Sequence, residues 1–196
     1  MENQKETVEK KDGKEGQLGN YFQYVINILK NPDSVLTEES QGKRQFGLIT
    51  LIAFLVLVVL TNFVGVLGYW DSLSYLGFSD YFNYFERAIA YGAALALVLF
   101  MFKNIAEKNG KKYDLNFFIE KLGALLVIPG VLLLLSIPID ILDVTIHIWF
   151  ASLGYTFLYL SIFLISYLYV AKNNLKTALL FVAGFYLVYH IIYYVL

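Results

Sequence analysis

Long apolar runs alternate with short polar segments along this chain. The runs extend over about Phe46–Trp70, Tyr81–Phe102, Phe117–Pro138, Thr145–Val170 and Leu175–Leu196. An α-helix needs roughly 20 apolar residues to cross about 30 Å of hydrocarbon, and each run is near or above that length. The pattern therefore predicts an all-α integral membrane bundle of five transmembrane helices.

A shorter amphipathic segment precedes the first run. One face at helical spacing is formed by Tyr21, Tyr24, Val25 and Ile28. Asn20 is a suitable N-cap, and Pro32 disfavours helical geometry at Asn31. Because the segment is too short to cross a bilayer, we expect an N-terminal amphipathic helix on the membrane or beneath the bundle. Residues 1–19 hold almost no large apolar side chain, so we expect a disordered cytoplasmic tail before a membrane domain at 20–196.

The composition supports a membrane protein and excludes several classes of function. Hydrophobic residues make up 58% of the chain and charged residues 16%. Soluble domains hold about 45–50% and about 25%, respectively. The lack of cysteine excludes disulfides, zinc ribbons and thiol catalysis. The net charge of −1 argues against a nucleic-acid partner, which would need a basic face.

The basic residues are confined to alternate connecting segments. All of the 15 lysines and arginines except Arg87 lie before the first run, between the second run and the first turn of the third (Lys121), or between the fourth and fifth runs. Positively charged loops stay in the cytoplasm, which places the N-terminus there and, after five spans of the plasma membrane, the C-terminus outside. Trp70 and Trp149 then fall at the outer interface, where such rings are enriched.

The start of the third run resembles a known pattern. A basic loop with a glycine leads to an aromatic residue and then to an apolar run with a proline. The residues concerned are Gly110, Lys111, Lys112, Phe117, Leu122, Gly123 and Pro129. With the aromatic segment that ends at Pro32 and the five spans, the chain resembles the bacterial branch of the Yip1 family of small membrane proteins. The resemblance implies a multi-pass scaffold with no enzymatic activity and no cofactor.

Two adjacent pairs of charged residues lie near the ends of apolar runs. Glu86 and Arg87 are near the start of the second run, and Glu120 and Lys121 near the start of the third. An ionisable group at mid-bilayer costs about 2.5–3.5 kcal/mol and is often functional, but a long side chain near a helix end can reach the headgroups. We therefore expect both pairs to act as interfacial anchors.

Acidic residues and histidines raise further possibilities. Asp140, Asp143 and His147 would share one helical face and could bind a divalent cation, although Pro138 favours a turn with solvated charges there. His190 is the only ionisable residue well inside the last run. With no acidic partner at that depth, we expect it to hydrogen-bond a tyrosine or a carbonyl instead of forming a proton relay.

Small residues and a proline predict the packing of two helices. Ala88, Gly92 and Ala96 form a small-xxx-small stripe that suits packing within the chain or a homodimer. Pro129, followed by Gly130, is expected to kink or loosen the third helix, because proline removes a backbone donor and clashes with the preceding turn.

These patterns favour a non-enzymatic scaffold or accessory subunit that binds the lipid bilayer and other proteins. Its partner would be a membrane protein, a cytosolic protein or a second copy of the chain. The candidate interaction and packing residues are Tyr21, Tyr24, Ile28, Pro32, Lys111, Lys112, Glu86, Arg87, Gly92 and Pro129. The alternative is a transporter or channel component with the break at Pro129 along its path. A lipid enzyme that uses Asp140, Asp143 and His147 is a third possibility.

Overall fold

The chain folds into long helices joined by short segments, and the computed structural model describes residues 19–37, 39–67, 77–142, 144–171 and 173–196. Residues 19–30 form an N-terminal helix. The 3-10 helix η1 (Pro32–Val35) follows, and then α2 (Arg44–Leu67), α3 (Phe78–Lys108), α4 (Leu115–Leu125), α5 (Val127–Ile141), α6 (His147–Ile165), the π-helix η3 (Ser166–Val170) and α7 (Leu175–Val195). The predicted tail lies outside the described residues, apart from residue 19.

Within the described residues, five helices are long and apolar enough to cross a membrane, which confirms the predicted fold class. The spans are Arg44–Val64, Phe82–Lys108, Leu115–Ile141, His147–Val170 and Leu175–Val195. The third consists of α4 and α5 together, and the fourth of α6 and η3. The protein is therefore a multi-pass membrane protein.

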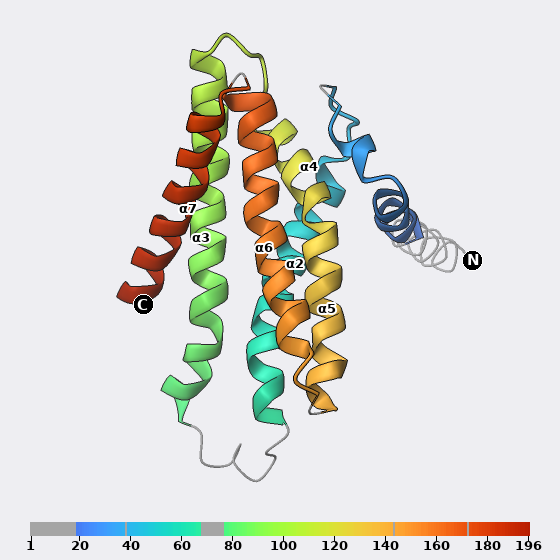
Figure 1. Cartoon of the computed structure of the whole chain (residues 1–196), viewed down its shortest axis with the longest axis vertical. Coiled ribbons are helices and arrows are strands. Elements are labelled where there is room, and N and C mark those ends of the chain that lie inside the picture. The colour runs from blue at the N-terminus through green and yellow to red at the C-terminus, as the bar shows by residue number, and fades with distance from the viewer. Residues whose placement is uncertain (1–18, 38, 68–76, 143, 172) are drawn as a thin grey trace, which may run out of the picture.

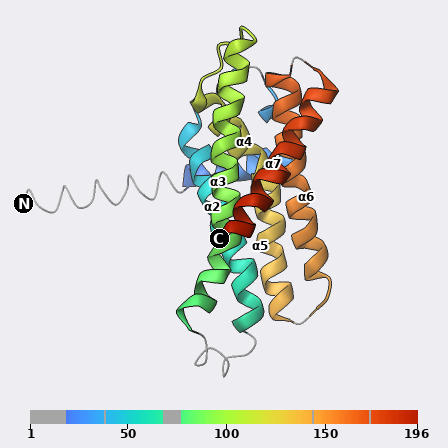
Figure 2. The same cartoon turned by 90° about the vertical axis from the view of Figure 1, so that its left-hand side faces the viewer.

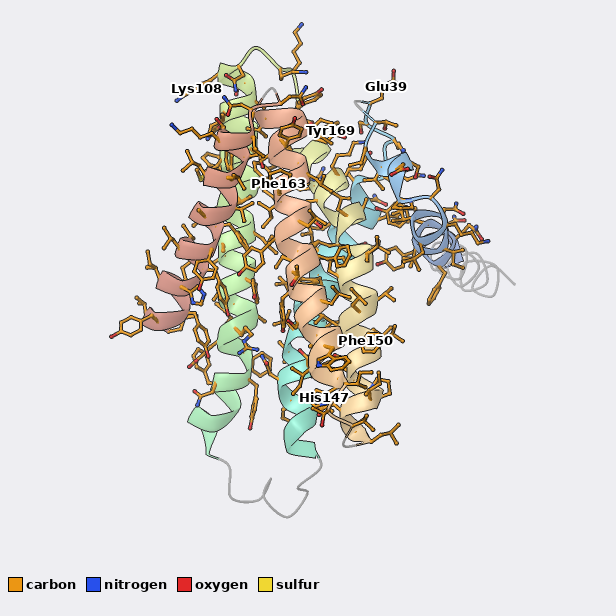
Figure 3. The ribbon with its side chains drawn as sticks, viewed as in Figure 1. Glu39, Lys108, His147, Phe150, Phe163 and Tyr169 are labelled. Carbon is orange, nitrogen blue, oxygen red and sulfur yellow. The ribbon has the colours of Figure 1, made fainter. Side chains whose placement is uncertain are left out.

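The bundle has two chemically different ends (Figure 3). Glu39, Lys108 and Tyr169 lie at one end, and His147 lies at the other. We call these the lysine-rich end and the lysine-poor end. The N-terminal helix lies beside the bundle on the lysine-rich half, close to α4 (Figure 1).

The core forms where α2 packs against α3, α4 and α5, α5 packs against α6, and α7 packs against α3. Figure 2 shows α7 crossing the bundle obliquely. The side chains with no exposed surface include Phe54, Val58, Leu122, Leu133, Leu158 and Ile162. Lipid tails are as apolar as these side chains, so close packing rather than burial from water holds membrane helices together.

A very close helix contact joins two glycines, Gly47 of α2 and Gly123 of α4. A Cβ atom on Gly123 would overlap the backbone of Gly47, and one on Gly47 would lie 2.6 Å from the carbonyl oxygen of Ile119. Backbone therefore meets backbone, as small residues permit in membrane helix pairs. This gives Gly123 a packing role.

The predicted small-residue stripe is split between two environments. Ala88 is buried, and a Cβ atom on Gly92 would lie 3.2 Å from the side chain of Leu55 on α2. Ala96 is exposed, whereas Ala90 and Ala94 have no exposed surface. Gly92 therefore serves packing within the chain, and the stripe does not form one continuous interface.

The third span is broken at Leu126, three residues before Pro129. α4 ends at Leu125 and α5 begins at Val127. Pro129 has no N–H to donate to the carbonyl of Leu125, and the Ser161 hydroxyl of α6 lies 3.5 Å from that oxygen. The predicted loosening near Pro129 is confirmed, and the break is enclosed because Leu126 and Val127 are buried.

We predict that Gly123→Ala lowers the free energy of unfolding by about 1–3 kcal/mol, because α2 and α4 must separate to admit the methyl group. Thermal unfolding in detergent measures the loss. Gly184→Ala is the matched control, since a Cβ atom there meets nothing within 4 Å. Equal stability of the two variants would contradict the proposed backbone contact.

Candidate functional site

A short segment crosses α4 at the lysine-rich end and connects η1 to α2. We call residues 36–43 the strap; residue 38 is outside the described part. Beneath it, Glu120 and Lys121 of α4 are only 4% and 1% exposed. Buried charges are stable only when they are paired and hydrogen-bonded. The hydrogen bonds of these two side chains therefore determine how the strap is held against α4.

The Glu120 carboxylate accepts three hydrogen bonds from the strap. The Ser40 hydroxyl donates at 2.9 Å, the Gln41 backbone N–H at 2.7 Å and the Lys43 backbone N–H at 2.9 Å. Lys43 directly precedes α2, and its carbonyl accepts from the N–H of Gly47. The carboxylate thus lies at the positive end of the α2 dipole, which stabilises a negative charge.

Lys121 binds the strap through donated hydrogen bonds. Its ammonium group donates to the Thr37 hydroxyl at 3.2 Å and to the Glu39 carbonyl at 3.0 Å, and it lies 5.3 Å from the centre of the Phe117 ring. Tyr169, from the π-helix η3, donates to the Thr37 carbonyl at 3.1 Å. Two helices far apart in sequence therefore hold the same strap.

The expectation that Glu120 and Lys121 are interfacial anchors is wrong. Both side chains point into protein, where backbone and hydroxyl groups of the strap replace the water or headgroups that a snorkelling side chain would reach. The sequence indicated this site in one way, by two adjacent charges inside an apolar run. It did not indicate their hydrogen-bond partners, which lie about 80 residues earlier in the chain.

The N-terminal helix packs through the predicted face. Tyr24 and Ile28 are buried and form a small core with Val35, Ala124 and Val127, and Tyr21 and Val25 pack against it. The Tyr21 hydroxyl lies 3.1 Å from that of Thr50 in α2. These contacts tie the helix to the same helices, α2 and α4, that hold the strap.

The ends of this helix were predicted with mixed success. Residue 19 is already helical, so Asn20 is not the N-cap. The helix does end at Lys30, before Pro32, which begins η1. The proline thus predicted the C-terminal end of the helix correctly, and the capping residue Asn20 did not predict its N-terminal end.

A small cavity lies between the N-terminal helix, the strap and α4. Its volume is about 30 Å³, and Tyr24, Gln41, Lys43 and Glu120 are among its lining residues. That space suits one or two water molecules. The Tyr24 hydroxyl is buried and has no hydrogen-bond partner among the described residues.

The two lysines of the predicted motif lie in the connection between α3 and α4, at the same end of the bundle. The Lys111 ammonium lies 5.5 Å from the centre of the Tyr113 ring, and Lys112 is exposed. They add positive charge to the surface around the strap.

A second polar cluster lies toward the lysine-poor end, around Arg87. The guanidinium donates to the side-chain oxygen of Asn62 on α2 at 3.1 Å. Arg87 therefore bonds within the bundle and is more than an interfacial anchor.

Two of the three residues of the possible cation site, Asp140 and His147, lie in the described part of the chain. The His147 Nε2 atom lies 3.3 Å from an Asp140 carboxylate oxygen, and Asp143 lies outside the described part. Among the residues described, no group of three His, Cys, Asp or Glu side chains could hold a metal ion. The His190 ring is tilted against that of Tyr186 and edge-on to that of Tyr189, with ring centres 4.2 Å and 4.9 Å away.

Comparison with family models, curated proteins and solved structures finds no match to this chain. The resemblance to the Yip1 family therefore stays a prediction from the motif and the span order.

We predict that Glu120→Gln releases the strap and lowers the free energy of unfolding by about 1.5–3 kcal/mol, the usual range for hydrogen bonds to a charged group. The amide offers one acceptor oxygen where the carboxylate offers two, and its NH₂ faces backbone donors. Thermal unfolding and protease cleavage within residues 36–43 report the change. Glu107→Gln, at an exposed position of α3, is the control. Unchanged cleavage in Glu120→Gln would contradict the conclusion that the Glu120 carboxylate holds the strap in place.

We predict a pH-dependent effect at Tyr24. Burial, with added effects of Tyr21 and Glu120, raises the pKa of the Tyr24 phenol well above its usual range. Stability from the neutral phenol is then present below the ordinary pKa of about 10 and is lost as pH rises above it. Tyr24→Phe should be at least as stable as the wild type at pH 7 and lose less stability between about pH 10 and 11. Thermal unfolding across pH tests this, with the exposed Tyr194→Phe as control. The same alkaline loss in both variants would contradict the assignment.

Proposed function

We propose that this chain is a non-enzymatic scaffold or accessory subunit, of the bacterial Yip1-like type, that binds another protein at its lysine-rich end. The observation that supports this most is the clamp of Glu120 and Lys121 on the strap. Buried charges that are fully hydrogen-bonded give little net stability, and their best-attested use is to specify one arrangement. Here that arrangement is a fixed N-terminal helix beside the bundle.

The outward face of this helix supports a binding role. Phe22, Ile26 and Leu29 are 61%, 41% and 44% exposed. They lie at i, i+4 and i+7, the spacing at which an amphipathic helix presents anchor residues to a groove or a membrane surface. Gln23 and Asn27, which share a hydrogen bond at 2.9 Å, form a polar stripe beside them. A partner would therefore contact an apolar stripe and a polar stripe on an N-terminal helix that is already fixed against the bundle.

The proposal includes an orientation. The lysine-rich end faces the cytoplasm because positively charged segments are retained there, so the C-terminus lies outside the plasma membrane. Trp149 supports this placement: it is 69% exposed near the start of α6, at the lysine-poor end, as expected for an interfacial ring.

Transport is the second candidate, and the broken third span is the feature that favours it. Breaks in spanning helices occur where they line a path or are enclosed by protein. Leu126 and Val127 are buried at this break, and Gly154 of α6 approaches it so closely that a Cβ atom there would lie 3.2 Å from the Pro129 carbonyl. This packing favours a structural role for the break, and hence the scaffold.

We predict that a photo-crosslinking residue at Gln23 captures a defined protein partner in native membranes. The same residue at Leu160, an exposed apolar position of α6, is the matched control for contact with lipid. Glu120→Gln should reduce the capture at Gln23 severalfold because it loosens the helix, whereas Glu107→Gln should not. The proposal would be contradicted if no protein were captured reproducibly at Gln23, or if the same protein were captured equally well at Leu160.

A further inference from the structure

A groove on the lipid-facing surface of the bundle runs between α3 and α7, which pack against each other (Figure 1). The groove has a volume of about 270 Å³. Its walls include Leu97, Met101 and Ile105 of α3 and Leu180, Gly184 and Val188 of α7. Both helices are membrane spans, and Leu97, Met101 and Leu180 are exposed, so the groove opens toward the lipid tails.

The groove exists because α7 has a glycine at its centre. A Cβ atom on Gly184 would meet nothing within 4 Å. Phe181 and Phe185 are buried and belong to the core, so they form a floor and leave the space above Gly184 open. Thr177 is the one polar side chain among the described residues of the lining. An ordered water molecule needs two to four polar partners, so this apolar groove does not suit water.

The size of the groove suits a single hydrocarbon chain. Residues 97–105 of α3 rise by about 12 Å, which is less than half of a hydrocarbon core of about 30 Å. A helix with its side chains is about 10–12 Å across, so a groove of this volume is too narrow for a spanning helix of another protein or of a second copy. The tail of a neighbouring lipid can enter it, and an empty groove would lose the dispersion contacts of its walls.

Two lysines continue the walls of the groove toward the lysine-rich end. Successive helix residues are about 100° apart, so Lys108 lies about 20° from Met101 around α3 and about 10 Å farther along it. In α7, Lys176 lies one turn before Leu180. Both lysines are exposed, and their long side chains can reach a headgroup just outside the hydrocarbon.

The two lysines lie at the same end of the groove. Figure 3 shows Lys108 at the end of α3. The side chain of the next residue, Asn109, donates to the Val170 carbonyl at 2.9 Å, which holds this end of α3 beside the segment that precedes α7. Glu107 lies about 120° from Met101 around α3 and therefore on a different face of the helix. An anionic group at this end of the groove would thus meet two positive charges.

We propose that this groove binds one acyl chain of an anionic phospholipid from the leaflet at the lysine-rich end, with the headgroup phosphate beside Lys108 and Lys176. Lysines near the membrane surface attract anionic lipids, and basic sites between spanning helices bind their headgroups. The groove accounts for the tail and the lysines for the headgroup, which favours a lipid over a dissolved anion. The site lies on the opposite side of the bundle from the N-terminal helix (Figure 1), so it is separate from the proposed partner surface.

The test measures lipid binding to the purified full-length protein in a neutral detergent. The probes are phosphatidylglycerol, phosphatidylcholine with the same acyl chains, and glycerophosphoglycerol, which is the headgroup without the chains. Titration followed by native mass spectrometry gives each affinity. We expect phosphatidylglycerol to bind about 10-fold more tightly than phosphatidylcholine, and glycerophosphoglycerol not to bind. Equal affinity of the two lipids would overturn the role of the lysines, and binding of glycerophosphoglycerol would overturn the role of the groove.

A variant of the groove tests the site of the acyl chain. Gly184→Leu places a side chain in the groove and should weaken the binding of both lipids severalfold. Ala183→Leu, at the exposed neighbouring position, is the matched control and should not. Equal affinities in these two variants would overturn the proposal.

Variants of the lysines test the site of the headgroup. Lys108→Gln combined with Lys176→Gln should remove the preference for phosphatidylglycerol and leave the binding of phosphatidylcholine unchanged. Lys30→Gln combined with Arg44→Gln removes two exposed positive charges from the N-terminal helix and α2 and should keep the preference. The proposal fails if the first pair of substitutions keeps the preference as well.

A measurement on the wild-type chain covers the case in which Gly184→Leu does not fold. Phosphatidylglycerol with a photoreactive group on its acyl chain is added at a low fraction to nanodiscs of phosphatidylcholine, and the labelled peptides are identified. We expect the residues that line the groove to be labelled more strongly than other lipid-facing positions, such as the exposed Leu160 of α6. Equal labelling at both places would overturn the proposal.

Discussion

Two opposite charges on consecutive residues of α4 must be satisfied inside protein, and much of the lysine-rich end follows from that constraint. Glu120 needs donors, and the strap supplies two backbone N–H groups and a hydroxyl. Lys121 needs acceptors, and the strap supplies a hydroxyl and a carbonyl. Because the strap joins η1 to α2, this requirement also places the N-terminal helix. The two charged side chains thereby fix the strap, and the strap holds the N-terminal helix in place.

The clamp depends in turn on how closely α2 approaches α4. The contact between Gly47 and Gly123 brings the start of α2 against α4, three residues beyond Glu120. That approach lets the Glu120 carboxylate reach the N–H of Lys43 just before α2 begins. The break at Leu126, where α4 gives way to α5, follows three residues after Gly123. Packing, charge and helix break thus belong to one short stretch of α4 and α5.

The sequence predicts the parts of this fold that depend on local pattern. Apolar run length predicts the five spans, helical spacing predicts the buried face at Tyr24 and Ile28, and Pro129 predicts the break. The site depends on contacts between segments about 80 residues apart, which no periodicity encodes. Adjacent charges in an apolar run are therefore open to two readings, an anchor in lipid or a pair inside protein. For Arg87 the helix alone suggests an interfacial anchor, and only its hydrogen bond to Asn62 on α2 shows otherwise.

The most direct test of this account measures whether the clamp fixes the N-terminal helix on the bundle. The chain has no cysteine, so spin labels can be placed at two exposed positions, Asn27 of that helix and Asn116 of α4. We expect electron paramagnetic resonance in lipid nanodiscs to give one narrow distance distribution for the wild-type chain. A variant with Glu120→Ala and Lys121→Ala should give a broad one. Broad distributions in both, or narrow distributions in both, would contradict the claim that these two residues hold the helix in place.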